Sequence, residues 1–238
     1  MLATTPRTGS TLLARALWAT GRVGAPKEYL NPTQLRDWEV RFGSPTSRAR
    51  HQLLRGRAVG LAGRLPWSEA RVATHLDRIA THRASASGQV GLKLHHHHRA
   101  RHLPGDSAHR LLPGARWIRL TRADRLGQAI SWVRARQTGR WASHEASRRA
   151  PRYSTRALKR ALDAIDQGER GWDRLLNGHS VLRVSYEQLT ADPLAVVNTV
   201  LDWLDEPPVH EVSLQLQPQA DATSEIWRAR FVAERERS

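Results

Sequence analysis

The chain has 238 residues, a formal net charge of +16 and no cysteine. Its length suits one α/β domain, or at most two small ones, with a sizeable core. The missing cysteine excludes a disulfide framework, a thiolate metal site and a cysteine nucleophile. With no run of about 18 apolar residues and no secretory pattern at the N-terminus, we expect a cytoplasmic protein without stable membrane insertion.

The positive charge is carried almost wholly by arginine. There are 38 basic and 22 acidic residues, and lysine occurs only at positions 27, 93 and 159, which leaves 35 arginines. Such a balance suits the binding of a phosphate or a polyanion. The arginines are scattered along the whole chain, however, and a GC-rich coding bias would produce the same excess. Charge alone therefore does not choose between nucleic acid and a small anionic ligand.

The first predicted elements are a strand, a turn and a helix. Residues 2–5 favour an extended strand, residues 8–10 a turn, and the apolar residues of 12–17 repeat at helical spacing up to a stop at Gly21. Only residues 1–5 are available for this strand, which is short for a buried central strand, so we expect the true start to lie upstream. Residues 33–85 form an arginine-rich, divergent segment that is interpreted as a helical insert.

Strands and helices then alternate to the end of the chain. Strands are predicted at 90–94, 117–121 and 181–184, and helices at about 126–133, 156–176 and 196–204. This alternation predicts parallel pairing with right-handed crossovers. The expected fold class is α/β, with one domain over residues 1–238 and a central parallel sheet flanked by helices.

The first chemical motif is Thr5-Pro6-Arg7-Thr8-Gly9-Ser10-Thr11, between the first strand and the first helix. Backbone N–H groups at a helix N-terminus bind anions, and the arginine and the hydroxyls add donors. The spacing of a Walker A motif is missing. An ordinary helix cap at Ser10 is the alternative interpretation.

A second motif joins Arg122, at the end of one strand, to Ser131 on the helix that follows. An arginine and a serine in these places suit a second phosphate. By itself the pair is weak evidence, because this spacing arises often by chance in an arginine-rich chain. No apolar strand ends in an aspartate, so no magnesium site is predicted.

Together these segments resemble the sulfotransferases that use 3′-phosphoadenosine-5′-phosphosulfate (PAPS). The similarity rests on residues 6–13, on the G-x-K-L pattern of residues 91–94, on Arg122 with Ser131 and on residues 184–193. Within that group, residues 24–30, 128–141 and 219–227 resemble the bacterial trehalose 2-sulfotransferase family. The resemblance covers nearly the whole chain except about 33–85, and it implies a P-loop-like sulfotransferase fold.

The resemblance also implies roles for individual residues. PAPS would be the co-substrate, and no metal is expected. The 5′-phosphosulfate would be held by Arg7, Thr8, Gly9, Ser10 and Thr11. The 3′-phosphate would be held by Arg122 and Ser131. The acceptor would be a sugar or glycolipid. Because the family is known as dimeric, the resemblance also implies a homodimer.

Three residues are predicted to be catalytic. Glu28 matches the family's catalytic glutamate, which would take a proton from a sugar hydroxyl. His95 is the competing base, because other sulfotransferases carry a lysine-x-histidine element after a strand and histidine titrates near neutrality. Lys93 would steady the bridging oxygen or the substrate, unless it is an exposed lysine at a strand end.

Aromatic and histidine residues suggest further roles. Residues 95–98 are four histidines that are expected on a loop, where they would bind metal only adventitiously. Trp18 and Trp203 are expected in the core, whereas Trp132 and Trp141 are candidates for stacking on a sugar or on adenine. Residues 186–193 are interpreted as a structural strand exit, turn and helix cap.

The leading hypothesis is a PAPS-dependent sulfotransferase that acts on trehalose or a trehalose-like glycoside, with no nucleic-acid partner. A lipo-oligosaccharide or another glycoconjugate is a close alternative as acceptor. A basic nucleic-acid-binding module would instead need a contiguous basic face. A kinase-like phosphoryl transferase is a third hypothesis. This sequence lacks the Walker lysine and the magnesium-binding carboxylates that such an enzyme needs.

Overall fold

The computed structural model describes residues 1–43, 66–141, 149–212 and 221–237, and its sheet has four strands. These are β1 (Leu2–Thr4), β2 (Lys93–His95), β3 (Trp117–Thr121) and β4 (Val181–Ser185). Every pairing between them is parallel, in the order β2-β1-β3-β4. The predicted α/β class with a central parallel sheet is confirmed.

The order of the strands creates a switch point at the carboxyl ends of β1 and β3. Leu2 pairs with Lys93 on one side and with Ile118 on the other, so β1 lies between β2 and β3. The chain moves from β1 to β2 on one side and from β3 to β4 on the other. The loops that follow β1 and β3 therefore diverge, and such a switch point is where open α/β sheets bind ligands.

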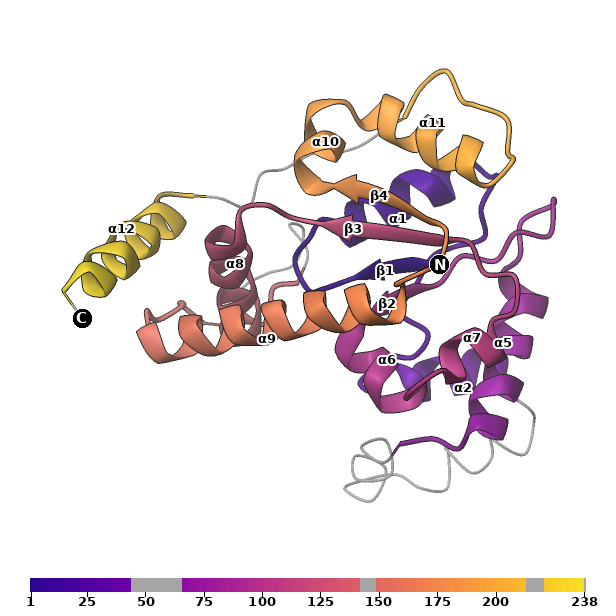
Figure 1. Cartoon of the computed structure of the whole chain (residues 1–238), viewed down its shortest axis with the longest axis horizontal. Helices are drawn as coiled ribbons and strands as arrows, with labels where there is room; N and C mark the ends of the chain where they lie inside the picture. The colour runs from indigo at the N-terminus through magenta and orange to yellow at the C-terminus, as the bar shows by residue number, and fades with distance from the viewer. Residues whose placement is uncertain (44–65, 142–148, 213–220, 238) are drawn as a thin grey trace.

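Helices cover both faces of the sheet (Figure 1). One face carries α1 (Ser10–Ala19), α10 (Tyr186–Ala191) and α11 (Pro193–Trp203). The other side of the molecule carries α2 (Leu35–Phe42), α5 (Glu69–Arg83), α6 (His96–His102), α7 (Ser107–Leu111) and α9 (Thr155–Leu175). Among the described residues, the two remaining helices are α8 (Arg125–Thr138) and α12 (Ala222–Glu236).

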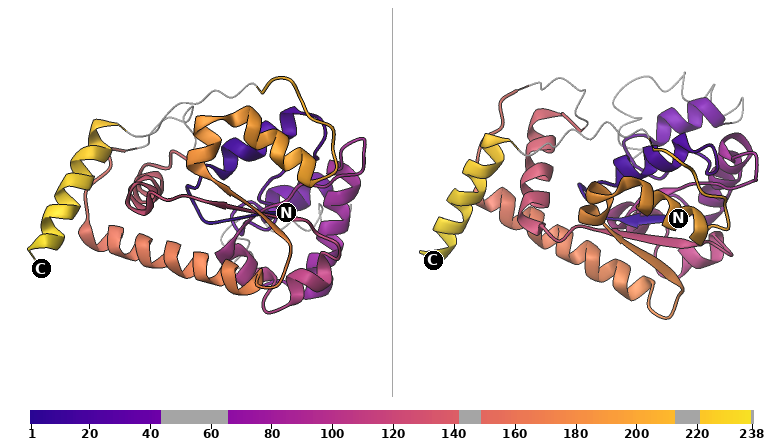
Figure 2. Two further views of the ribbon diagram at one scale, coloured as in Figure 1. Left: turned by 45° about the horizontal axis from the view of Figure 1, so that its top comes forward. Right: turned by 90° about the horizontal axis from the view of Figure 1, so that it is seen from above.

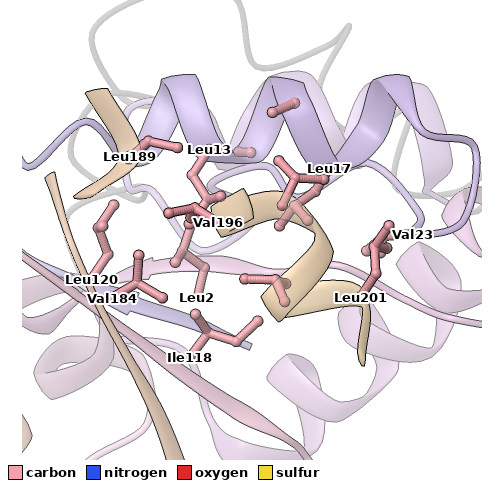
Figure 3. Packing of buried hydrophobic residues seen from close by; sticks show 14 of the residues in the cluster. Leu2, Leu13, Leu17, Val23, Ile118, Leu120, Val184, Leu189, Val196 and Leu201 are labelled. Atoms are coloured by element: carbon pink, nitrogen blue, oxygen red, sulfur yellow. The ribbon is translucent and has the colours of Figure 1, made fainter. Parts of the chain in front are cut away.

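The pleat of β1 divides the core in two. Leu2 packs with α1 and α11 in the cluster of Figure 3, whereas the next residue, Ala3, belongs to a cluster on the opposite face with Trp172 of α9. Successive residues of a strand point to opposite faces, so three residues of β1 are enough to join both clusters. Burial of both faces explains why apolar residues predominate in the central strands β1 and β3.

A third cluster lies away from the sheet, between α8, α9 and α12 (Figure 2). Ile130 of α8 and Ile165 of α9 pack there with Trp227 and Phe231 of α12. The sequence reasoning predicted α8 and α9 but did not assign a helix to α12. None of the described helices is long and apolar enough to span a membrane.

Several local predictions need correction. The strand predicted at 90–94 is shifted to Lys93–His95, so His95 ends the strand instead of following it. The other histidines of the 95–98 run begin helix α6 and do not lie on a loop. Trp18 is 47% exposed and is not a core residue, although Trp203 packs against the first cluster. Within the 33–85 insert, α2 and α5 are helical and residues 44–65 lie outside the described part.

Candidate active site

The loop after β1 has the backbone geometry of an anion-binding nest. Arg7 has a φ of 66° and Gly9 a φ of 82°, whereas Thr8 between them has a negative φ. Alternation of this kind turns successive N–H groups toward one point. Helix α1 begins at Ser10 without any side-chain cap, so the alternative of an ordinary serine cap is not what forms there. The loop and the helix N-terminus together suit a phosphate or sulfate group.

The side chains of this loop differ in their accessibility. The Thr8 hydroxyl is fully buried and bonds to the Thr5 carbonyl oxygen over 3.1 Å and to the Thr4 hydroxyl. Thr8 would therefore offer an anion its backbone N–H and not its hydroxyl. Ser10 is buried, whereas Thr11 is exposed and its hydroxyl accepts a hydrogen bond from Lys93 Nζ over 2.9 Å.

Gly9 is held against the ring of Tyr186. A Cβ on Gly9 would lie 2.6 Å from Tyr186 Cδ2, and only glycine tolerates that approach together with the positive φ. The same ring faces the guanidinium of Arg122, whose Cζ lies 4.6 Å from the ring centroid. Tyr186 thus contacts both the loop and Arg122. The sequence reasoning gave residues 186–193 only a structural part, and the position of this tyrosine at the exit of β4 was the available signal.

The two predicted phosphate motifs meet in space. Arg7 Nε donates to Ser131 Oγ over 2.9 Å, and Arg122 NH1 donates to the Arg7 carbonyl oxygen over 3.4 Å. The Arg7 guanidinium therefore meets Ser131, and the Arg122 guanidinium lies against the backbone of Arg7. Arg7 NH1 also donates to the carbonyl oxygen of Trp141 over 2.6 Å. Trp141, one of the two tryptophans predicted to stack on a ligand, therefore lies beside Arg7.

Asp124 lies beside Arg122 and was not singled out from the sequence. It caps α8 through the N–H of Gly127 at 2.9 Å, and its carboxylate contacts Arg122 at 3.3 Å and Arg228 of α12 at 2.7 Å. Two arginines share one carboxylate, so this group keeps a net positive charge. Helix α12 thereby brings a further cation close to Arg122.

The three predicted catalytic residues form one contact group. Glu28 Oε1 lies 2.9 Å from Lys93 Nζ and 3.2 Å from His95 Nε2. A β-bridge between Lys27 and Leu92 aligns the two segments that carry them. The other carboxylate oxygen, Oε2, accepts a hydrogen bond from Asn31 over 2.7 Å. Lys93 also contacts Thr11, so it links this group to the loop after β1.

Charge dominates the protonation of Glu28. Burial raises the pKa of its carboxyl group, but the charges and hydrogen bonds of His95 and Lys93 outweigh burial and hold the pKa well below its ordinary value. Glu28 is therefore a carboxylate at neutral pH. His95 Nδ1 is buried and has no hydrogen-bond partner among the described residues.

A buried polar network supports the loop from below, and the sequence reasoning missed it. Thr5 Oγ1 donates to Glu169 Oε1 over 2.7 Å and accepts from Gln128 Nε2 over 2.9 Å. Glu169 Oε2 pairs with Arg119 at 2.8 Å and with Arg125 at 2.9 Å. The loop is thereby tied to β3, α8 and α9.

Among the described residues, no group of three or more histidine, aspartate or glutamate side chains is arranged to hold a metal ion. Trp132 is half-buried and lines a small hollow with Pro6 and His96, whereas Trp141 is 49% exposed.

Comparisons with solved structures agree with this fold. The sulfotransferase domain from the curacin biosynthetic pathway superposes with a TM-score of 0.52 at 16% identity, over 88% of this chain and 74% of that one. The sulfotransferase domain from the Synechococcus PCC 7002 olefin synthase superposes with a TM-score of 0.51 at 16% identity, over 96% of this chain and 86% of that one. At this identity the likeness concerns the fold.

Sequence comparisons carry the assignment further. Trehalose 2-sulfotransferase from Mycobacterium tuberculosis is 28% identical over 97% of this chain and 92% of that protein. Trehalose 2-sulfotransferase from Mycolicibacterium smegmatis is 30% identical over 94% of this chain and 91% of that protein. The family model for Stf0 sulphotransferase matches residues 1–234. The loop after β1, the Arg122–Ser131 segment and Glu28 all fall within that match, and the chain belongs to the Stf0 sulphotransferase family.

Proposed function

We propose that this sulfotransferase moves the sulfuryl group of PAPS to a hydroxyl of a carbohydrate. Trehalose or a trehalose-like glycoside is the first acceptor to test, because both curated relatives carry that name. A lipo-oligosaccharide with a similar terminal sugar is the alternative acceptor.

The contacts that join Arg7 to Ser131 and Arg122 to the backbone of Arg7 support the choice of donor more than any other observation. In the proposal, the nest of residues 7–9 and the first turn of α1, with Ser10 and Thr11, hold the 5′-phosphosulfate. Arg122 and Ser131 hold the 3′-phosphate. Guanidinium groups suit phosphates because they donate two parallel hydrogen bonds.

The proposed step is an in-line displacement at sulfur. The acceptor oxygen forms a bond to sulfur, the bond from sulfur to the bridging phosphate oxygen breaks, and 3′,5′-adenosine bisphosphate leaves. Glu28 takes the hydroxyl proton, since it is ionised and anchored beside the loop. Lys93 bridges Glu28 and Thr11, so its ammonium is placed to offset the charge that develops on the leaving oxygen. The role of His95 is to hold the Glu28 carboxylate.

Nucleotide binding tests the donor assignment. In a thermal-shift assay with EDTA and no magnesium, 3′,5′-adenosine bisphosphate should raise Tm clearly more than 5′-AMP, which lacks the 3′-phosphate. Arg122→Ala should abolish that difference, whereas Arg183→Ala, which removes an exposed arginine of β4, should preserve it. Equal shifts from both nucleotides in the wild-type protein would rule out the PAPS assignment.

Transfer itself is measured with a labelled donor and a panel of sugars, read by mass spectrometry. Sulfated trehalose supports the proposal, and transfer only to a glycolipid favours the alternative acceptor. Failure of transfer together with tight, salt-sensitive binding of nucleic acid would favour the basic binding module. The homodimer and the cytoplasmic location stay predictions, which light scattering and cell fractionation can test.

A further inference from the structure

A hollow of about 170 Å³ lies between the end of α1 and the end of α5. Its lining comes from Trp18 of α1, from residues 21–25 and from the last residues of α5 with the segment that follows. Helix α1 begins at the loop that is proposed to bind the donor, and Trp18 lies eight positions after Ser10, which is about 12 Å along a helix axis. The hollow is therefore separate from the residues proposed to hold PAPS.

Close packing of the main chain shapes this hollow. The N–H of Gly24 donates to the carbonyl oxygen of Gln89 over 3.1 Å, and a Cβ on Gly24 would lie only 2.0 Å from the carbonyl oxygen of Arg83. A side chain at this position would push residues 21–25 away from the end of α5. The walls of the hollow are thus fixed by backbone contacts and not by mobile side chains.

Two cations lie over the same exposed indole. Trp18 is 47% exposed, and Lys27 Nζ lies 5.1 Å and Arg83 Cζ 5.4 Å from the centroid of its ring. Cation–π attraction holds both groups beside the hollow. Arg83 is held further by its Nε, which donates to the Tyr29 hydroxyl over 3.1 Å. An anion next to the indole can therefore meet both positive charges.

These cations have no acidic partner. The Lys27 ammonium has no hydrogen bond or ion pair with any described residue, and none of the described residues that line the hollow carries a carboxylate. Burial, together with repulsion from Arg15, Lys93 and Arg83, lowers the pKa of Lys27. A bound anion would relieve that repulsion.

The negative charges in this region are weaker than the positive ones. Helices α1 and α5 both end here, and each helix C-terminus counts as about half a negative charge. Glu206 is bonded to Ser87 over 2.6 Å and does not line the hollow. The full charges of Arg15, Lys27 and Arg83 exceed the two helix ends, so the hollow keeps a positive potential.

We propose that this hollow is a second anion site, which binds the phosphate or sulfate monoester of a small sugar. Lys27 and Arg83 would hold the ester oxygens, and the exposed indole of Trp18 would pack on the sugar ring. His82 and Ser85 of the lining offer further hydrogen bonds. A sulfated sugar is the class of product that the proposed reaction makes, and a phosphorylated sugar is the other source of such an ester. The site itself does not rest on the proposed function.

The indole N–H of Trp18 gives a local readout of binding. Its signal in a ¹⁵N-correlated NMR spectrum is assigned by its loss in Trp18→Phe. With the donor site filled by 3′,5′-adenosine bisphosphate, glucose 6-phosphate or glucose 6-sulfate should shift this signal. Unmodified glucose and inorganic phosphate should each bind at least about tenfold more weakly than the better ester. The ester that binds more tightly identifies the source.

Charge variants test the two cations. Lys27→Gln and Arg83→Gln should each weaken ester binding at least about tenfold, because each removes a charged hydrogen-bond donor. Lys159→Gln and Arg160→Gln remove the same charges at exposed positions of α9 and should change it less than about twofold. Arg83→Lys keeps the charge and should recover most of the affinity. The affinity for 3′,5′-adenosine bisphosphate should stay within about twofold in all these variants.

Three results would overturn the second anion site. The first is a Trp18 signal that neither ester moves. The second is an equal loss of ester binding in Lys27→Gln and Lys159→Gln, which would mean general attraction to a basic protein. The third is binding of glucose or inorganic phosphate as tight as that of the better ester. If the wild-type protein does not bind 3′,5′-adenosine bisphosphate, the donor assignment fails, while the titration of the Trp18 signal still decides this proposal.

Discussion

Arg7 donates a hydrogen bond from Nε to Ser131 Oγ over 2.9 Å, although 124 positions separate the two residues in the chain. The bond joins the loop after β1 to helix α8, which follows β3. Because β1 and β3 are adjacent and parallel in the sheet, their carboxyl ends bring both segments to the same end of the sheet. The fold thereby assembles a candidate binding site for two phosphates from motifs that are each weak alone.

Ser131→Ala tests that assembly. The alanine variant loses one proposed hydrogen bond to the 3′-phosphate, so its affinity for 3′,5′-adenosine bisphosphate should fall about tenfold, and its affinity for 5′-AMP less than about threefold. Isothermal titration calorimetry measures both. Ser180→Ala, at an exposed position before β4, should change neither. Equal losses for the two nucleotides would show that Ser131 does not read the 3′-phosphate.

Gly9→Ala should disable the loop more than it destabilises the fold. The added Cβ meets both a positive φ and the Tyr186 ring at 2.6 Å, so the nest must distort and donor affinity should fall more than about tenfold. Gly178→Ala is the matched control, because Gly178 also has a positive φ, 76°, but open space around it. If both variants bind 3′,5′-adenosine bisphosphate equally well, the contact with Tyr186 is unimportant.

Much of this site follows from sequence because its residues sit at fixed places relative to strands. A turn with glycine after β1 and an arginine after β3 are local patterns, and the resemblance added Glu28 to them. The Gly9–Tyr186 contact could not be predicted, since it depends on how closely β4 and α10 approach the loop. Glu169 was in principle detectable, because it falls between Ile165 and Trp172 on the buried stripe of α9. Its partner Arg119 lies on another element, which only the packing of α9 on the sheet reveals.

The histidine run shows the limit of local patterns in another way. Residues 95–98 give no apolar periodicity, so neither the end of β2 nor the start of α6 could be read from them. Their burial is a tertiary effect: α6 is packed against α9 through Gly171. Glu28 and His95 were treated as competing bases from the sequence, and the structure instead places them in direct contact, with His95 Nε2 3.2 Å from Glu28 Oε1.

Glu28→Gln should remove turnover and spare donor binding. Loss of a general base lowers kcat by about 10²–10⁴-fold, while the loop that binds the nucleotide is unaltered. Glu69→Gln, at a surface ion pair with Arg110, should keep full activity. Near-normal turnover in Glu28→Gln together with an inactive His95→Ala would identify His95 as the base. Since Lys93 and His95 hold the pKa of Glu28 well below 4.5, the wild-type kcat should not lose its base until the pH falls below that value.

Buried histidines should make the fold sensitive to acid. Burial lowers the pKa of His98 to about 2 and that of His102 to about 4, from an ordinary 6.5. The unfolded chain binds protons below about pH 6.5 and the folded chain does not, so stability is full above that pH and is lost as the pH falls toward the folded values. His98→Gln should reduce the slope of unfolding free energy against pH by about one proton between pH 6 and 4.5. Urea titrations measure this slope, and His210→Gln, at an exposed position, should leave it unchanged.

The Glu169 network should matter for both stability and the loop. Arg119 is 1% exposed and pairs with Glu169, so Glu169→Gln leaves a buried guanidinium without its counter-ion and should cost about 3–5 kcal/mol. Replacing both partners by leucine removes the buried charge as well, and this double variant should be more stable than Glu169→Gln in urea unfolding. Glu236→Gln, on the exposed end of α12, should be neutral. Because Thr5 donates to Glu169, donor affinity should fall in both network variants, even where stability recovers. A double variant as unstable as the single one would mean that Glu169 acts through packing and not through its charge.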